Sequence, residues 1–192
     1  MLSKLSTLIL GTIAESKKNP YELTKMIKQL DLNKWFSIAE STVYATINTL
    51  KKKGLITGER LQKGNFPEKT VYSITAEGEF ELHRSISKYL ERNNLGGEEF
   101  DVAILLMHNL GKEELMQKLK FKLESLESAN YDLKKKILKL ELKGDKHSTN
   151  LTLLKHRLYL LEAETKTIKD LIKNVNLRKS LVTESPFDLR VN

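Results

Sequence analysis

The second half of the chain carries two apolar series whose members alternate three and four residues apart, the spacing of a coiled-coil seam. They comprise Met116, Leu119, Leu123, Leu126, Asn130, Leu133, Ile137 and Leu140, and then Leu151, Leu154, Leu158, Leu161, Thr165, Ile168, Ile172 and Val175. The connection at 144–149 is so short that two helices joined by it run antiparallel. The pattern therefore predicts a long helical hairpin. Its polar members Asn130 and Thr165 either fix the register or lie near an open end of the seam.

A two-helix hairpin leaves apolar side chains on its outer faces only partly covered. These side chains are Leu138, Leu142, Tyr159 and Leu160. We therefore expect a second copy of the chain to cover the hairpin, and we expect segment 100–110 to join this packing. The candidate dimerisation residues are Met116, Leu119, Leu123, Leu126, Leu133, Ile137, Leu154, Leu158, Leu161, Ile168 and Ile172.

Composition limits the possible functions. The 192 residues include no Cys, which excludes a disulfide scaffold, a thiol nucleophile and thiolate metal sites. The chain has 33 Lys and Arg against 25 Asp and Glu, a net charge of +8 that favours an anionic partner. No apolar run reaches the roughly 18 residues of a membrane span. Residues 1–14 are compatible with a short signal peptide, but their helical spacing favours an amphipathic first helix. We expect a cytoplasmic protein.

The first half predicts shorter elements. Helices are expected over 3–15, from Asn19-Pro20 onward and over 39–53, where Gly54 ends the third helix. Tyr21, Leu23, Met26, Ile27 and Leu30 are expected to form the apolar face of the second helix. Two β-prone runs, 55–62 and 69–74, flank a Gly/Pro turn and indicate a hairpin, after which Thr75 caps a fourth helix. This order is that of a winged helix-turn-helix.

The third helix of this half carries the functional argument. If Val43 lies at the centre of its inner face, the opposite face holds small and hydrogen-bonding side chains. They are Ser41, Thr42, Ala45, Asn48, Thr49 and Lys52. Such a face fits the major groove of double-stranded DNA, where Asn can read adenine and small groups can contact a thymine methyl. An ordinary solvated helix face is the alternative.

Further candidate DNA-contact residues surround this face. The expected phosphate and sugar contacts are Lys51, Lys53, Arg60, Lys63, Asn65 and Lys69. Tyr44 either reaches a phosphate with its hydroxyl or packs at the edge of the core. Because Lys is abundant throughout the chain, the alternative for each lysine is that it is an ordinary solvent-exposed side chain with no role in binding DNA.

Five motifs stand in one order and spacing: Leu8-Ile-Leu-Gly11, Tyr21-Glu-Leu23, Ser41-Thr-Val-Tyr44, Leu50-Lys-Lys-Lys-Gly-Leu-Ile56 and Tyr72-Ser-Ile-Thr-Ala-Glu-Gly78. Over about residues 5–90 the chain resembles the PadR family of bacterial transcriptional regulators. The resemblance implies a winged-helix homodimer that represses transcription, a helical C-terminal region that completes the dimer, and in some members release by a small-molecule effector. The run Gly64-Asn-Phe-Pro-Glu-Lys69 is less basic than the wing common in that family.

We therefore expect a mainly α fold with a small β-hairpin, divided into three regions. These are a winged-helix DNA-binding domain at 1–92, a C-terminal antiparallel, coiled-coil-like dimerisation domain at 98–176 and a tail at 177–192. No catalytic motif is present, and His83, His108, His147 and His156 are dispersed. We expect no enzyme activity, no cofactor, no metal and no membrane partner. The alternative function is a helical protein-interaction module that keeps a winged-helix shape without reading DNA.

Overall fold

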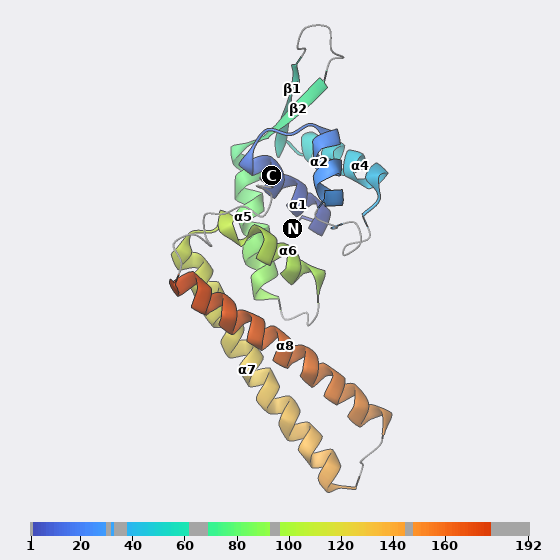
Figure 1. Cartoon of the computed structure of the whole chain (residues 1–192), viewed down its shortest axis with the longest axis vertical. Helices are drawn as coiled ribbons and strands as arrows, with labels where there is room; N and C mark the ends of the chain where they lie inside the picture. Colours follow the sequence, from blue (N-terminus) through green and yellow to red (C-terminus); the bar gives the residue numbers. More distant parts are fainter. Residues whose placement is uncertain are drawn as a thin grey trace.

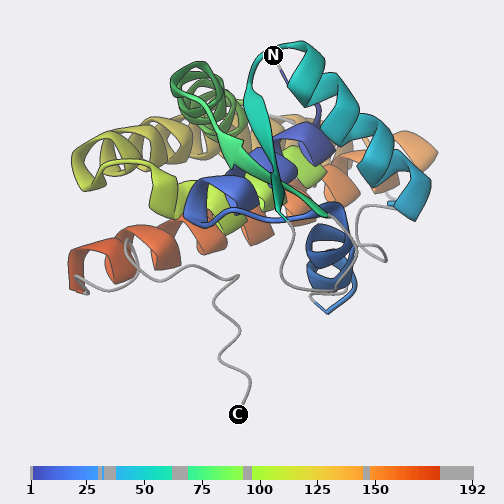
Figure 2. The same cartoon turned by 90° about the horizontal axis from the view of Figure 1, so that it is seen from above.

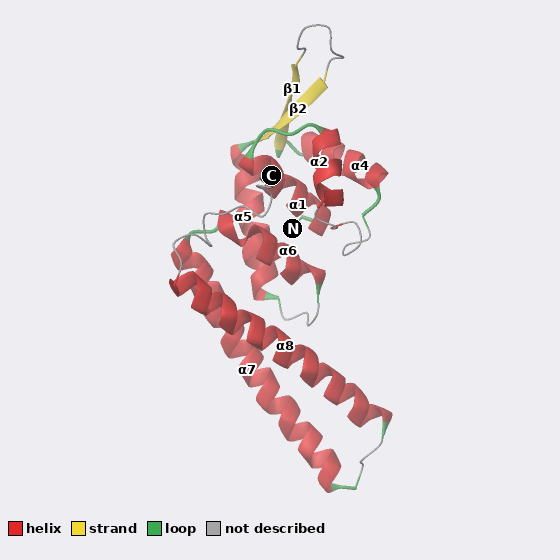
Figure 3. Ribbon diagram, in the orientation of Figure 1, coloured by secondary structure: helices red, strands yellow, loops and turns green. Residues whose placement is uncertain are grey.

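The computed structural model describes residues 2–29, 32, 38–61, 69–92, 97–144 and 148–177, apart from the Leu177 side chain. The elements are α1 (Lys4–Glu15), α2 (Pro20–Gln29), α4 (Glu40–Lys52), β1 (Ile56–Leu61), β2 (Lys69–Ile74), α5 (Ala76–Glu91), α6 (Glu98–Leu106), the 3-10 helix η1 (Met107–Asn109), α7 (Lys112–Leu142) and α8 (Thr149–Leu177). In Figure 1 the strand pair and the α7–α8 hairpin project from opposite ends of the body formed by the other helices. Figure 3 shows that helix dominates, which confirms the expected fold class.

Helices α1, α2 and α5 begin at capping residues that are recognisable in the sequence. The Ser3 hydroxyl accepts a hydrogen bond from a backbone N–H in the first turn of α1. At α2 the capping is reciprocal: the backbone N–H of Asn19 donates to Glu22 Oε2 (2.9 Å), and the backbone N–H of Glu22 donates to Asn19 Oδ1 (3.0 Å). The hydroxyl of Thr75 accepts from the backbone N–H of Gly78 at 3.1 Å and so starts α5. These local hydrogen bonds explain why the helix starts follow from the sequence.

The strand pair is antiparallel, with Ile56 opposite Ile74 at its base. A backbone bridge joins β2 to the α1–α2 connection: Lys18 N donates to Tyr72 O (3.2 Å), and Tyr72 N donates to Lys18 O (2.9 Å). In Figure 2, α4 and α5 lie on opposite sides of the strand pair. The bridge ties the start of α2 to β2, so the helices beside the strand pair keep a fixed place relative to it.

Helix α1 is at the centre of the core. Its residues Leu8, Ile9 and Leu10 are buried, and the helix packs against α4, α5, α6 and β2. Helix α6 packs on α1 and α5, and Leu106 approaches α1 at Gly11, where an added Cβ would lie 2.3 Å from Leu106 Cδ2. Segment 100–110 was expected to pack with the long hairpin. It does share one buried cluster with hairpin residues such as Leu119 and Leu161, and α6 in addition completes the core around α1. One buried cluster therefore includes residues of both expected regions, 1–92 and 98–176.

Helices α7 and α8 form the predicted antiparallel hairpin (Figure 1). The eleven candidate dimerisation residues lie in the seam between them, where the packing of one chain alone leaves five buried and six half-buried. Thr165 is buried in the middle of this seam, and its hydroxyl donates to Leu161 O at 2.7 Å. It therefore does not lie at an open end. The seam residues stabilise the hairpin, and its outward-facing side chains remain exposed.

Candidate nucleic-acid interface

Helix α4 separates a buried face from an exposed one. Val43, Ile47 and Leu50 are buried, and the predicted contact residues of the helix face solvent. The exposed set comprises Ser41, Thr42, Tyr44, Ala45, Asn48, Thr49, Lys51 and Lys52, followed by Lys53 at the C-cap. The helical spacing thus brings together on one surface the residues that the sequence assigned to it.

Hydrogen bonding distinguishes the polar groups on this face. The Thr49 hydroxyl donates to Ala45 O at 2.9 Å, so its proton is already bound and its methyl group and oxygen remain available. Within the described part of the chain, the Asn48 side-chain amide has no hydrogen-bond partner, and the residue is exposed. An exposed, unpaired amide can donate and accept at once, as reading an adenine edge requires. Asn48 is therefore the side chain on α4 best suited to base recognition.

The charges on α4 are separated along its length. Glu40 in the first turn is paired with Lys28 of α2, whereas Lys51 and Lys52 lie in the last turn. Neither of these two lysines, nor Lys53 after them, has an acidic partner among the described residues. The cationic end of the helix can therefore bind anions. The negative end of the helix dipole, at the C-terminus of α4, stabilises these lysines.

The strand pair carries the other predicted contacts. Arg60 on β1 lies opposite Thr70, and Lys69 on β2 lies opposite Leu61. The side chains of both Arg60 and Lys69 are exposed. The predicted contacts Lys63 and Asn65 and the rest of the turn lie outside the described residues. Figure 1 shows the described strands extending beyond the level of α4.

Tyr21 corrects one prediction. Its side chain was expected on the apolar face of α2, yet it is 70% exposed, while Leu23, Met26 and Ile27 are buried. Two residues along a helix amount to a rotation of about 200°. This spacing puts Tyr21 on the side opposite Leu23, so the helical wheel contains the signal that identifies it as a surface residue.

The exposed Tyr21 lines an open depression with a volume of about 720 Å³ between α2, α4 and β2. Tyr44 and Tyr72 contribute aromatic rings to its lining, and Lys25 and Lys69 contribute ammonium groups. Neither lysine has an acidic partner among the described residues. The depression thus combines these two lysines and the Glu22 carboxylate with tyrosine side chains beside the exposed face of α4.

The acidic and histidine side chains were also considered as possible metal ligands. The described residues contain no group of three or more His, Cys, Asp or Glu that could hold a metal ion. His108 does have an acidic partner that its sequence neighbours do not reveal, because its Nε2 lies 3.0 Å from Glu15 Oε1 at the end of α1. This contact joins η1 to α1. None of the described helices has the length and apolar character needed to cross a membrane.

The arrangement of α1, α2 and α4, followed by a strand pair and α5, defines a winged helix. Residues 9–84 match the model of the family described as "Transcriptional regulator PadR-like family". A relative, the negative transcriptional regulator PadR of Bacillus subtilis, is 24% identical over 155 residues, which span 81% of this chain and 85% of that protein. The resemblance read from the sequence is thus confirmed over residues 9–84, which match a family of transcriptional regulators.

The chain was also compared with solved structures. Bacillus subtilis PadR in complex with operator DNA is 21% identical, with a TM-score of 0.40 and coverage of 89% of this chain and 98% of that chain. The same protein in complex with p-coumaric acid is 19% identical, with a TM-score of 0.39 and coverage of 91% and 97%. A PadR-like transcriptional regulator from Bacillus cereus is 19% identical, with a TM-score of 0.42 and coverage of 91% and 97%.

Proposed function

We propose that the chain is a homodimeric regulator that binds double-stranded DNA sequence-specifically and represses transcription. The exposed face of α4 carries this proposal, because it combines the unpaired amide of Asn48 with small neighbours and a cationic end. Repression is supported by the name of the Bacillus subtilis relative, a negative transcriptional regulator. A regulator of this kind acts on cytoplasmic DNA, which is where we place the protein.

The proposed DNA contacts fall into two groups. Ser41, Thr42, Ala45, Asn48 and Thr49 face base edges. Phosphates are bound by Tyr44, Lys51, Lys52, Lys53, Arg60 and Lys69, and by Lys63 and Asn65 in the turn between the strands. To the phosphate group we add Tyr21 and Lys25, because they line the depression beside Tyr44 and Lys69. Phosphate contacts position a protein on the duplex, and base contacts specify the sequence.

The proposed dimer contact is the outward face of the α7–α8 hairpin. Leu138 is 56% exposed, Leu142 is 78% exposed and Tyr159 is 63% exposed, although all three are large apolar side chains. Large apolar side chains left exposed on a helical hairpin are candidates for a protein–protein contact. A twofold dimer would present two α4 helices to successive turns of the DNA, as a palindromic operator requires. Release of the DNA by a small-molecule effector stays a prediction from the family resemblance.

The test is a binding comparison at one fixed salt concentration. The full chain is titrated into a duplex taken from upstream of its own coding region and into a scrambled duplex of equal length and composition. We expect tighter binding to the native duplex by at least about 10³-fold, the lower end for specific over non-specific binding. Equal affinities, or none, contradict sequence-specific regulation and favour the alternative of a protein-interaction module. Light scattering on the isolated chain checks the dimer, and a monomer at micromolar concentration contradicts it.

A further inference from the structure

Lys122 of α7 is a fully buried cation. Its side chain has a relative exposure of 0%, and no other Lys or Arg in the described part of the chain is buried. Moving an ammonium group out of water is costly unless hydrogen bonds and an opposite charge compensate it. The partners of Lys122 therefore show which elements this cation holds together.

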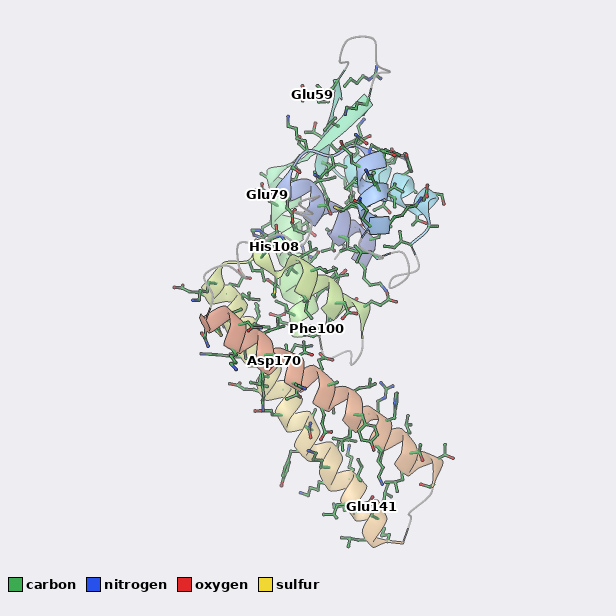
Figure 4. The ribbon with its side chains drawn as sticks, viewed as in Figure 1. Glu59, Glu79, Phe100, His108, Glu141 and Asp170 are labelled. Carbon is green, nitrogen blue, oxygen red and sulfur yellow. The ribbon has the colours of Figure 1, made fainter. Side chains whose placement is uncertain are left out.

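Lys122 has partners on three other elements. Its Nζ donates to the carbonyl oxygen of Arg92 at the C-cap of α5 (2.6 Å) and is ion-paired with Glu164 Oε1 of α8 (2.8 Å). The same Nζ lies 4.6 Å from the centroid of the Phe100 ring on α6. Figure 4 labels Phe100 where α6 meets the long hairpin. One ammonium group thus joins the winged-helix body to both helices of the hairpin.

Other polar contacts line the same junction. On α7, Glu114 accepts a hydrogen bond from the Ser87 hydroxyl at 2.7 Å, and Lys118 is paired with Glu91 of α5. Glu114, Lys118 and Lys122 follow one another at intervals of four residues, so they form one polar row along α7 facing α5. Lys122 is the buried end of that row.

The negative charge of Glu164 also acts on the Asp101 carboxyl of α6. Partial burial, and then the negative charge of Glu164, raise the pKa of the Asp101 carboxyl. Asp101 and Glu164 are thus acidic neighbours across α6 and α8, and Lys122 supplies the cation between the hairpin and the body. Apolar contacts are non-directional, whereas hydrogen bonds and buried ion pairs favour one geometry.

We propose that Lys122 is a positioning residue that fixes the angle between the winged-helix body and the α7–α8 hairpin, and hence the separation of the two α4 helices in the dimer. The proposal rests on the dimeric DNA-binding function proposed above. Its consequence is that the buried pair sets the spacing of operator half-sites that the protein accepts.

The deciding variant removes both charges and roughly keeps the volume: Lys122→Met with Glu164→Leu. A buried ion pair exchanged for apolar groups often leaves stability unchanged or raised, whereas removal of one partner leaves an unpaired charge. We therefore expect Lys122→Met alone to melt at a lower temperature and the double variant to recover most of that loss. The matched control is Lys134→Met with Glu162→Leu, a pair that joins the same two helices at 2.8 Å but is exposed (56% and 44%).

The angle is measured with two spin labels. The chain has no Cys, so cysteines introduced at the exposed positions Thr57 on β1 and Lys139 on α7 are the only attachment sites. An excess of unlabelled chain ensures that each dimer holds one labelled protomer. We expect the double variant to broaden or shift the distance distribution while the control keeps that of the unchanged protein. A distribution equal to that of the unchanged protein overturns the proposal.

The consequence for DNA is tested separately. On the native upstream duplex and on duplexes whose half-sites are moved apart by one base pair at a time, the double variant should lose about tenfold in affinity, or about 1.4 kcal/mol, for the preferred spacing. An unchanged spacing preference contradicts the positioning role. If no form of the chain binds this DNA, the proposed function fails, but the label distances still decide whether Lys122 sets the angle. Should the double variant not fold, Lys122→Met with Glu164→Met replaces it, with the same expected and contradicting results.

Discussion

Asn48 is the residue at which base recognition is most directly testable. Its amide is exposed on α4 and unpaired within the described part of the chain. Asn48→Ala should reduce the preference for particular bases by about 1–3 kcal/mol per half-site, because a bidentate contact is lost, and should leave the melting temperature unchanged. Binding to a set of single-base operator variants measures this. If Asn48→Ala leaves the base preference intact, the assigned face of α4 is wrong.

Gly78 is required by a close approach between α5 and the start of β1. A Cβ at this position would lie 2.1 Å from the backbone oxygen of Leu55, which cannot move aside as a flexible side chain could. Gly78→Ala should therefore lower the free energy of unfolding by about 1–3 kcal/mol. Urea denaturation measures the loss, and His83→Ala, an exposed change on the same helix, should stay within about 0.5 kcal/mol. Equal stability of the two variants would contradict the clash.

At the scale of elements, the α7–α8 hairpin depends on its internal seam. Ile168 is 0% exposed between the two helices. Ile168→Ala should destabilise the protein by about 2–5 kcal/mol, because it removes buried methyl groups and leaves a cavity. Thr167→Ala changes the neighbouring exposed position and should cost no more than about 0.5 kcal/mol. Thermal unfolding at one protein concentration compares them, and a small loss at Ile168 would mean that the seam is not tightly packed.

The elements also show which structural features sequence patterns predict and which they do not. The bounds of α1, α4 and β2 agree closely with the expectation, because Ser3, Gly54 and Thr75 act on their immediate neighbours in the chain. The partners of α6 were only partly predicted, because the hairpin was expected but α1 and α5 were not. The apolar residues of α6 can pack against any apolar surface, and sequence periodicity does not identify which element supplies that surface. Only the folded chain shows that α1 and α5 cover it.

For the whole molecule, the dimer depends on the outward face of the hairpin. Leu142→Glu together with Tyr159→Glu places charges on this exposed apolar surface and leaves the seam intact. We expect light scattering to show a shift toward monomer, with helix content retained in circular dichroism. The same double variant should lose operator affinity, because the two α4 helices no longer bind as a pair. A stable dimer of this variant would place the contact elsewhere.

Salt dependence tests the electrostatic footprint of the whole dimer. If four to six of the fourteen cations proposed for the dimer neutralise phosphates, the logarithm of the association constant should fall with the logarithm of salt concentration at a slope of about −4 to −5. Lys52→Ala removes two such contacts per dimer and should flatten the slope by about 2. Titrations at several salt concentrations give both slopes. An unchanged slope would remove Lys52 from the phosphate contacts.

The sequence by itself determined the features that depend on neighbours in the chain: the helix caps, the turn at Gly54, the buried and exposed faces of α4 and the heptad seam of the long hairpin. These follow from periodicity and local hydrogen bonding, which act within a few residues. Only the tertiary structure decided which distant residues meet. It joined Lys122 to Arg92 and Glu164, and His108 to Glu15. Such pairs depend on how separate elements pack, and no local spacing encodes that arrangement.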